Sequence, residues 1–461
     1  MAELAEFDRY MSHLCEGLDY ATRHQSLLDY CSGLMLPIER KSVEPLAAHA
    51  DPLHVPAKHQ ALHHFVATAR WSDRALLDRV MGYVEPQLGL EHGAFWIVDD
   101  TGHPKCGRHS VGVARQYCGQ LGKQDNCQVA VSLSLATAAA SVPVDYQLYL
   151  PEAWAADRKR RRKVGVPDTV QFATKPEIAL AQIRAAQQRG VPQGIVLADA
   201  AFGTNTAFRE GLTELGLRYA VGVISTLTVW APGTGALPAA RYKGHGRPAH
   251  RLRRAPGHQP LTVKQLALQL KPSVWRTVTW REGTNGTLFS RFARVRVRAA
   301  HRDASPEEQW LLVEWPAAET EPTKYWLANL PTDISIKQLV DTAKMRWRIE
   351  HDYHELKQEF GLSHYEGRGW LGFHHHATLC IAAYGFLTGQ RLSQASKKNS
   401  TRPQAAALPA DYQPRGSRPS TAPRPRLHPD VALPPQQGAR VPPVALPVLR
   451  LGEEASVTQY D

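Results

Sequence analysis

The spacing of apolar residues divides the chain into stretches with different predicted secondary structure. Residues 1–88 place apolar side chains three and four positions apart, as in "FDRYMSHLCEGL" and "HQALHHFVATARWSDRALLDRVM". That spacing is typical of amphipathic helices, and few strand-like runs interrupt it. We therefore expect a helical module over residues 1–88.

Residues 89–223 change to an alternation of strands and helices. "GAFWIVDDTG" is a short apolar run that ends in Asp99 and Asp100, as a buried strand ends. "CQVAVSLSLAT" and "VPVDYQLYL" alternate between apolar residues and small or polar ones with a period of two. Two such runs joined by a few small residues predict an antiparallel pair of strands.

A helix and two further strands follow this pair. Thr174 with Glu177 three positions later forms a capping box, and Gly190 is a candidate C-cap. "GIVLADAAFG" is an apolar strand ending in Asp199, and "NTAFREGLTELG" and "RYAVGV" read as a helix and a strand. The order of three strands, helix, strand, helix and strand predicts an α/β fold, with a mixed sheet flanked by helices.

The rest of the chain divides into an insertion, a return to the core and a tail. Residues 224–332 are rich in Pro, Gly, Thr, Arg and Trp and contain strand-like pieces such as "VWRTVTWREG" and "EQWLLVEW". They predict a β-rich insertion, after which residues 333–394 complete the α/β core. Residues 395–461 are rich in Pro, Arg, Ser and Ala without periodicity, so we expect a disordered, low-complexity tail.

One predicted helix carries an unusual acid. "KMRWRIEHDYHELKQEFG" continues a single amphipathic helix that begins at Ser335, with Gln338 at the capping-box position, and ends at Gly361. Glu350 falls inside the apolar stripe of this helix, which predicts a carboxylate beside a buried seam. Such a carboxylate needs a cationic partner, because burying an unpaired charge is costly.

Composition limits the classes of protein. No apolar run approaches the roughly 18–20 residues of a membrane span, and the N-terminus has no signal-peptide pattern, so we expect a cytoplasmic protein. The six cysteines form no C-x-x-C pair, which argues against a disulfide framework or a zinc site. Lys and Arg outnumber Asp and Glu by 55 to 43. That excess favours a polyanionic partner such as nucleic acid, although the chain could equally be a basic enzyme.

Three acids from distant segments are candidates for one metal site. If the two acid-bearing strands are neighbours, Asp99 or Asp100 and Asp199 emerge at the same edge of the sheet, and a helix across that edge brings Glu350 to them. Carboxylates are preferred ligands of Mg²⁺, and two ions about 3.5–4 Å apart can clamp both oxygens of a phosphoryl displacement. We favour Asp99 over Asp100, because Asp99 ends the apolar run directly and Asp100 lies on the opposite side of the pleat.

Each acid also has an ordinary structural interpretation. Glu350 could be a surface acid that pairs with Arg346 or His354 on its own helix. Asp199 could cap the following helix, and Asp99 and Asp100 could mark only a turn after a strand. The joint placement of the three acids is what favours a metal site.

The order of elements, the insertion and the acids resemble the DDE transposases of bacterial insertion sequences, whose catalytic core is ribonuclease H-like. "WIVDDTG", "IVLADAAFG" and "ANLPTDISIKQLVDTAKMRWRIEHDYHELKQEFG" are similar to the family segments that carry the first, second and third acids. One branch of this family carries the pattern Y-x2-R-x3-E-x6-K in the segment of the third acid. Arg346, Glu350 and Lys357 match that spacing, whereas Ala343 stands at the tyrosine position. The likeness spans roughly residues 10–390.

The resemblance implies metal-dependent cleavage at transposon ends, then attack of the freed 3′-OH on target DNA. Two Mg²⁺ ions, or Mn²⁺ as a substitute, would be held by Asp99 or Asp100, Asp199 and Glu350. It further implies double-stranded DNA partners (terminal inverted repeats and target DNA), a homodimer on DNA, no membrane contact, and a nucleoid-associated location in a bacterial cytoplasm.

Several cations and one aromatic residue are candidate DNA contacts. The resemblance assigns Arg346 and Lys357 to DNA phosphates, and Arg348 on the same segment is a further candidate. Trp280, beside Arg281 in "TWREGTNG", could stack on an unpaired base near the cut. The module of residues 1–88 could touch DNA or serve only as a packing domain.

Two further runs have more than one interpretation. "RKRRRK" (158–163) could be a solvated loop or a loop that contacts phosphates. "HHH" (374–376) predicts packing or phosphate contact instead of a metal cluster, because adjacent helical residues point in different directions.

Two alternative functions stay open: a ribonuclease H-like nuclease without strand transfer, and a decayed, non-catalytic DNA-binding copy.

Overall fold

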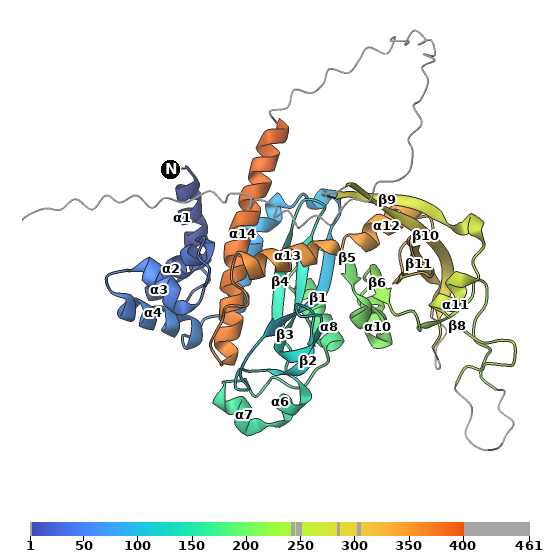
Figure 1. Ribbon diagram of the computed structural model, residues 1–461, viewed down its shortest axis with the longest axis horizontal. Helices are drawn as coiled ribbons and strands as arrows, with labels where there is room; N and C mark the ends of the chain where they lie inside the picture. Colours follow the sequence, from blue (N-terminus) through green and yellow to red (C-terminus); the bar gives the residue numbers. More distant parts are fainter. Residues whose placement is uncertain (1, 241–244, 246–250, 284–285, 302–305, 401–461) are drawn as a thin grey trace, which may run out of the picture. The chain divides into compact units, whose positions relative to one another are not determined.

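The computed structural model describes residues 2–240, 245, 251–283, 286–301 and 306–400 (Figure 1). The chain divides into two compact units, residues 1–393 and 394–461. Nearly all of the predicted tail, residues 401–461, lies outside the described residues, and its predicted disorder stays a prediction. Among the helices that the structure describes, none is both long and apolar enough to cross a bilayer.

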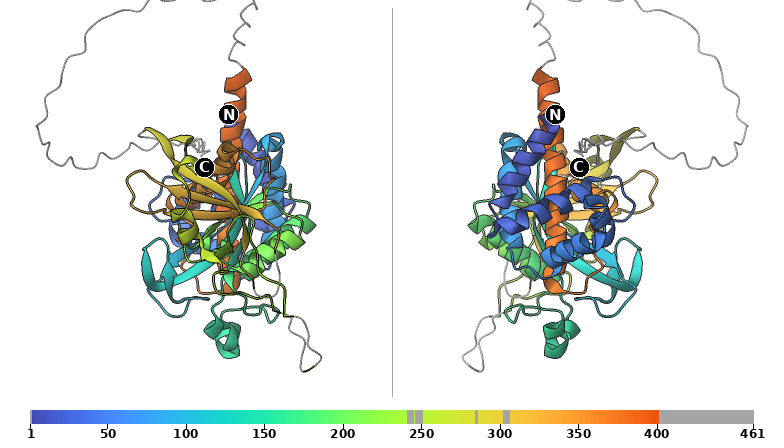
Figure 2. Two further views of the ribbon diagram at one scale, coloured as in Figure 1. Left: turned by 90° about the vertical axis from the view of Figure 1, so that its right-hand side faces the viewer. Right: turned by 90° about the vertical axis from the view of Figure 1, so that its left-hand side faces the viewer.

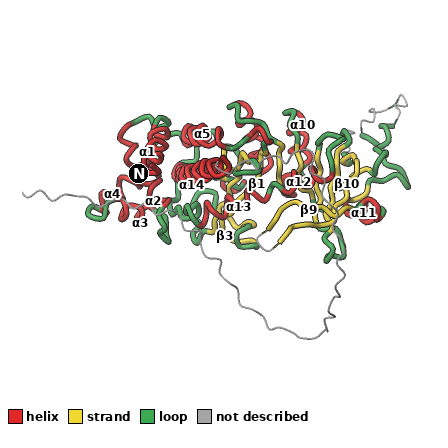
Figure 3. The backbone as a smooth tube through the Cα atoms, turned by 90° about the horizontal axis from the view of Figure 1, so that it is seen from above, coloured by secondary structure: helices red, strands yellow, loops and turns green. Residues whose placement is uncertain are grey.

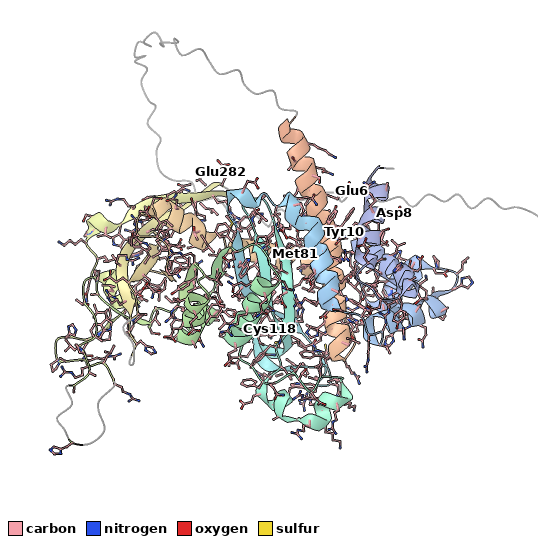
Figure 4. The ribbon with its side chains drawn as sticks, turned by 180° about the vertical axis from the view of Figure 1, so that it is seen from behind. Glu6, Asp8, Tyr10, Met81, Cys118 and Glu282 are labelled. Atoms are coloured by element: carbon pink, nitrogen blue, oxygen red, sulfur yellow. The ribbon has the colours of Figure 1, made fainter. Side chains whose placement is uncertain are left out.

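The N-terminal part is helical, as predicted, and packs on the last helix of the unit. Its helices are α1 (Ala2–Cys15), α2 (His24–Met35), α3 (Val43–Ala50), α4 (Val55–Ala67) and α5 (Asp73–Val84), and the last helix is α14 (Trp370–Ser400). The hydroxyl of Tyr10 donates to the carbonyl of Ala382 at 2.8 Å. Tyr10 lies near Met81 of α5 in Figure 4, and both side chains are buried in one core. Figure 2 shows α1–α4 covering one side of α14.

A twelve-stranded sheet forms the centre of the unit. Its order is β2-β3-β1-β5-β6-β12-β11-β10-β7-β8, with β4 also paired to β3 and β9 to β10. The strands before the insertion are β1 (Phe95–Pro104), β2 (Ala114–Cys118), β3 (Lys123–Ala136), β4 (Ser141–Leu148), β5 (Ile195–Ala198) and β6 (Tyr219–Val223). The helices among them are α6 (Glu152–Ala156), α7 (Arg158–Lys163), α8 (Lys175–Gln188), α9 (Ala200–Gly203) and α10 (Thr206–Glu214).

The predicted α/β fold is confirmed by how these strands pair. β3 is antiparallel to β1 and to β4, whereas β5 is parallel to both β1 and β6. This is the mixed sheet of three strands, helix, strand, helix and strand that was expected for a ribonuclease H-like core. The capping box of Thr174 and Glu177 is present, and Gly190 follows α8 with a φ of 75°. Strand β2 and the short helices α6 and α7 were not predicted.

The β-rich insertion continues the same sheet. Its elements are β7 (Thr228–Trp230), β8 (Leu261–Thr262), α11 (Val263–Leu268), β9 (Arg276–Gly283), β10 (Gly286–Ala299), β11 (Gln309–Trp315) and β12 (Lys324–Ala328). The last strand, β12, returns to pair antiparallel with β6 of the core. Figure 3 shows the helices α1–α5 and α14 at one end of the unit and the insertion strands at the other.

The prediction of one long helix from Ser335 to Gly361 is wrong. Two helices stand there, α12 (Ile336–Lys344) and α13 (Trp347–Gln358). Met345 donates to the carbonyls of both Asp341 and Thr342, so the last turn of α12 tightens before α13 starts. The predicted capping box at Ser335 is confirmed.

Candidate active site

The two aspartate-bearing strands are neighbours, as the metal-site prediction required. Ile97 of β1 pairs with Leu197 of β5 in a parallel register. Asp99 lies two residues beyond Ile97, and Asp199 directly follows β5. Because the strands run in the same direction, both carboxylates belong to the same region of the sheet.

Asp99 is a buried carboxylate with one cationic partner. Its side chain is only 13% exposed, and its Oδ2 accepts from Arg346 at 2.7 Å. Its Oδ1 accepts from the backbone N–H of Asp100. Burial raises the pKa of Asp99 to about 7; Arg346 opposes this shift, and the negative charges of Asp199 and Asp100 add to it. Asp99 therefore has less positive charge around it than an ionised buried carboxylate requires.

Asp100 points to the other side of the pleat. Its Oδ2 forms an ion pair at 2.7 Å with Lys175, the first residue of α8. Arg346 thus contacts Asp99 and not Asp100, and the preference for Asp99 as the metal ligand stays a prediction. Lys175 carries no distinguishing signal in the sequence, because a lysine at the start of a helix is common on protein surfaces.

Asp199 and Glu350 show the ordinary roles that were considered for each. The Oδ1 of Asp199 caps α9 by accepting from the backbone N–H groups of Ala201 and Phe202, at 2.9 and 3.3 Å. Glu350 accepts from Arg346 at 2.7 Å, one turn earlier, and its side chain is 64% exposed. The expectation that Glu350 lies beside a buried seam is wrong, because Glu350 lies on the exposed side of α13, whereas Ile349, Tyr353 and Leu356 form its buried side.

Arg346 links the acids that the sequence placed far apart. Its guanidinium donates to Asp99 with one nitrogen and to Glu350 with another. Burial disfavours the charged guanidinium, but Asp99, Glu350 and Asp199 outweigh this and raise the pKa of Arg346. Two carboxylates therefore pair with one guanidinium, and the charge of Asp199 also acts on it.

The carboxylates of Asp99, Asp199 and Glu350 are the kind of ligand that a hard divalent cation prefers. Carboxylate oxygens are the preferred ligands of Mg²⁺ and Mn²⁺, and Asp99 is a buried acid whose negative charge is incompletely neutralised. Of the described residues, no three His, Cys, Asp or Glu side chains are close enough together to hold one ion. Arg346 lies between Asp99 and Glu350 instead, so the acids face a guanidinium in this arrangement.

Lys357 contacts the protein itself. Its ammonium donates to the carbonyl of Gly102 on β1 at 2.9 Å and to Gln120 in the β2–β3 turn at 3.3 Å. Burial lowers the pKa of Lys357, although the nearby carboxylates of Asp100 and Asp99 act against this shift. This lysine ties α13 to the end of β1.

Trp280 packs into the insertion. Its ring meets Phe292 edge-on, with centroids 5.6 Å apart, and the ammonium of Lys344 lies 4.3 Å from its centre. Lys344 also forms a 2.6 Å ion pair with the buried Glu314. The half-buried indole is thus covered on at least two sides by its own chain.

Arg281 and Arg348 stack on one aromatic ring. Their guanidinium carbons lie 4.0 and 4.7 Å from the centre of the Trp347 ring, at the start of α13. Arg348 also donates to the carbonyl of Ala138 in the β3–β4 turn. This stack fixes the strand β9 and the β3–β4 turn against the helix that carries Glu350 (Figure 1).

Two residues of α13 that sequence reasoning missed hold this helix in place. The hydroxyl of Tyr353 lies 2.7 Å from that of Ser132, the β3 residue that pairs with Asp99. Asp352, on the buried side of α13, accepts from Ser141 and Tyr384. Burial raises the pKa of Asp352 to about 6. An acid two residues after Glu350 gives no sequence signal of such a role, because its partners come from other elements.

The three consecutive histidines pack inside the protein, one of the two roles that were expected. His375 places both ring nitrogens 3.0 Å from carbonyl oxygens, those of Val66 and Trp71. His376 contacts the hydroxyl of Tyr30 and the carbonyl of Gly361. These side chains join α14 to the N-terminal helices.

Comparison with known proteins places this chain within a family. A relative from Microchaete diplosiphon, described as a probable transposase for insertion sequence element IS701, is 33% identical over 167 residues. That match covers 36% of this chain and 41% of the relative, so the chain matches less than half of the relative's length. A family model described as DDE superfamily endonuclease matches residues 13–287, which include Asp99 and Asp199 and end before Glu350. The expected kinship is confirmed: this chain belongs to the DDE superfamily of endonucleases.

Proposed function

We propose that this protein is a DNA transposase that cuts DNA at the ends of an insertion sequence and joins the freed ends to a target. The single observation that supports this most is that Arg346 pairs with both Asp99 and Glu350, while Asp199 follows the strand parallel to the one that carries Asp99. Arg346 thereby links the end of α12 and the start of α13 to the strand β1, 247 positions earlier in the chain. The family membership and the probable IS701 transposase among its relatives support the same proposal.

Asp99, Asp199 and Glu350 would hold Mg²⁺ or Mn²⁺, as two ions. When bound, such ions activate the attacking oxygen and stabilise the leaving oxygen of an in-line phosphoryl transfer. Asp199 is fixed in orientation by its two bonds from backbone N–H groups, whereas Glu350 is 64% exposed and is held by Arg346. Arg346 would exchange its two carboxylate partners for a phosphate of the bound DNA, since a guanidinium binds both groups in the same bidentate manner.

Double-stranded DNA is the proposed substrate, both at the element ends and at the target. The net charge of +12 favours such a polyanion. Lys357, Arg348, Arg281 and Trp280 would contact DNA near the cut only after local rearrangement, because each contacts its own chain in this structure. A homodimer on DNA and a role of residues 1–88 in DNA binding stay proposals.

The test uses supercoiled plasmid that carries the natural DNA flanking this reading frame. Wild-type protein should nick it with Mg²⁺ or Mn²⁺ and not with EDTA. Asp199→Asn and Glu350→Gln should abolish nicking while duplex binding persists. Asp333→Asn and Glu359→Gln, which alter exposed acids before α12 and after α13, are the matched controls and should cut normally.

A joining assay separates transposition from simple cleavage. Pre-cut ends with free 3′-OH groups are mixed with target plasmid and the wild-type protein. Covalent donor–target products support the transposase. Nicking without any joining would leave a nuclease, and binding without either reaction would leave a non-catalytic DNA-binding protein.

A further inference from the structure

The run "RKRRRK" forms the helix α7, so the prediction of a loop at residues 158–163 is wrong. Asp157 caps this helix by accepting from the backbone N–H of Arg160 at 2.9 Å. Arg161 is buried and donates to the carbonyls of Ala155, Pro167 and Val170. The cationic segment is therefore held in a defined conformation by one of its own arginines.

Arg160 joins this helix to a second segment. Its guanidinium carbon lies 3.5 Å from the centre of the buried Trp154 ring, and one of its nitrogens donates to the carbonyl of Arg108 at 2.7 Å. Two of the six cations in the run thus have structural roles. The other four, two arginines and two lysines, are exposed.

A third segment adds to the same surface. The backbone N–H of Val111 donates to the carbonyl of Arg368, and that of Trp370 donates to the carbonyl of Val164, just after α7. The side chains of Arg108 and Arg368 are both exposed. Segments separated by about fifty and two hundred residues along the sequence thereby converge. We call the result the basic patch, which consists of Arg108, Arg158, Lys159, Arg162, Lys163 and Arg368.

Within the part of the chain that the structure describes, none of these six side chains forms an ion pair. Two of the acids near these cations have other roles: Asp157 caps the helix, and Glu366 pairs with Arg40. The exposed Glu152 and Asp168 are also among the described residues, and they form no ion pair with any of the six. Six like charges on one rigid surface repel one another, and a polyanion would relieve that repulsion. An ordinary solvated face would instead mix both signs of charge.

The basic patch is distinct from the carboxylate cluster. In Figure 1, α6 and α7 lie beyond the lower end of the sheet, whereas α13 crosses the sheet higher up. Cys118, at the end of β2, marks this lower end in Figure 4. We propose that the basic patch is a second DNA-binding surface, which holds the phosphate backbone of duplex DNA at a distance from the cut. This inference rests on the proposed function and adds to it a surface that is not part of the catalytic site.

The test measures binding of a fluorescent 40-bp duplex of arbitrary sequence over a range of salt concentrations. The patch variant R158Q/K159Q/R162Q/K163Q leaves Arg160 and Arg161 intact, so α7 keeps its anchors. We expect at least a tenfold weaker Kd at about 0.1 M salt. The slope of log K against log salt should fall by about 0.9 for each phosphate contact that is lost.

The matched control removes the same charge from scattered positions. R184Q/R254Q/K271Q/K324Q changes four exposed cations outside residues 1–88 and should bind nearly as wild type does. The variant R158K/R162K keeps the charge and should retain both affinity and salt slope. The thermal unfolding midpoint of each variant shows whether it is folded.

The outcomes distinguish this inference from the proposed function. If wild-type protein neither binds duplex nor nicks plasmid, the proposed function itself fails. If wild-type protein binds and nicks, but the patch variant has the Kd and salt slope of the scattered control, the inference is wrong and the proposed function stands. A patch variant that binds weakly, yet nicks at the wild-type rate when DNA is saturating, supports both.

Discussion

At the scale of single residues, the main feature of this site is a buried carboxylate with too little compensating charge. Asp99 is 13% exposed, has a pKa raised to about 7, and shares its one guanidinium with Glu350. Arg346 therefore acts as the counter-ion of both acids. A divalent cation could replace it with twice the charge.

The neighbouring aspartates should differ sharply in activity. If Asp99 is a metal ligand, as proposed, Asp99→Asn should lower the cleavage rate by about a thousandfold or more, since losing such a ligand removes several kcal/mol of transition-state stabilisation. Asp100→Asn should retain most activity, because Asp100 pairs with Lys175 on the other side of the pleat. Single-turnover nicking of plasmid measures both. Equal losses in the two variants would contradict the assignment.

Replacing Arg346 should make protein stability depend on metal. Arg346→Gln leaves Asp99 and Glu350 without their cation, which should cost on the order of 1 kcal/mol of unfolding free energy in EDTA, because Glu350 is mostly exposed and Asp99 can take up a proton. Adding Mg²⁺ should restore more stability to this variant than to wild type. Thermal unfolding with and without Mg²⁺ measures the difference, with Lys337→Gln on the exposed side of α12 as control. A variant that is no more metal-sensitive than the control would argue against the exchange.

At the scale of elements, the sequence predicts helix caps made by neighbouring residues, but it does not predict features that depend on contacts between distant segments. The capping boxes at Thr174 and Ser335 involve neighbours three positions apart, so their residues predict them directly. The break between α12 and α13 was missed because apolar spacing continues across Met345. Arg346, which lies at the break, donates a hydrogen bond to Asp99, 247 positions away in the sequence.

The buried histidines of α14 should make the protein less stable in acid. Burial lowers the pKa of His375 and His376 to about 4 each, whereas an unfolded chain binds these protons near pH 6.5. The unfolded state therefore binds more protons between pH 6.5 and 4, and the unfolding free energy falls as pH falls through this window. Each histidine contributes up to about 1.4 kcal/mol per pH unit.

Comparing variants isolates this effect. The raised pKa values of Asp99 and Asp352 act in the opposite sense over part of the same range, so wild type alone shows only the sum. His376→Gln should be less stable at neutral pH, because it loses the contact with Tyr30, but its stability should change less between pH 6.5 and 4. Denaturant unfolding at several pH values measures this. Parallel curves for the variant and wild type would contradict it.

At the scale of the whole molecule, the insertion is part of the sheet that carries the site. The β-rich composition of residues 224–332 was evident from the sequence, but the pairing of β12 with β6 was not. That pairing joins strands about a hundred residues apart, and no local pattern specifies it. Likewise, the contact of Arg281 with Trp347 needs the folded insertion beside α13.

Removing the insertion should therefore unfold the core. Replacing residues 225–329 with a short Gly-Ser linker would expose the edge of β6, where Val221 and Val223 are buried. Exposed apolar edges pair with other chains, so the product should be insoluble. Shortening the exposed turn at residues 317–320 by two residues should leave a soluble, folded control. A soluble deletion variant with a cooperative unfolding transition would show that the insertion is separable.

The most direct test of the central claim counts the divalent ions that the acids hold. Electron paramagnetic resonance of Mn²⁺ in the presence of duplex DNA should show ions bound to wild type that are lost in Asp99→Asn, Asp199→Asn and Glu350→Gln. Asp333→Asn should bind as wild type does. Unchanged Mn²⁺ binding in all three acid variants would contradict the account.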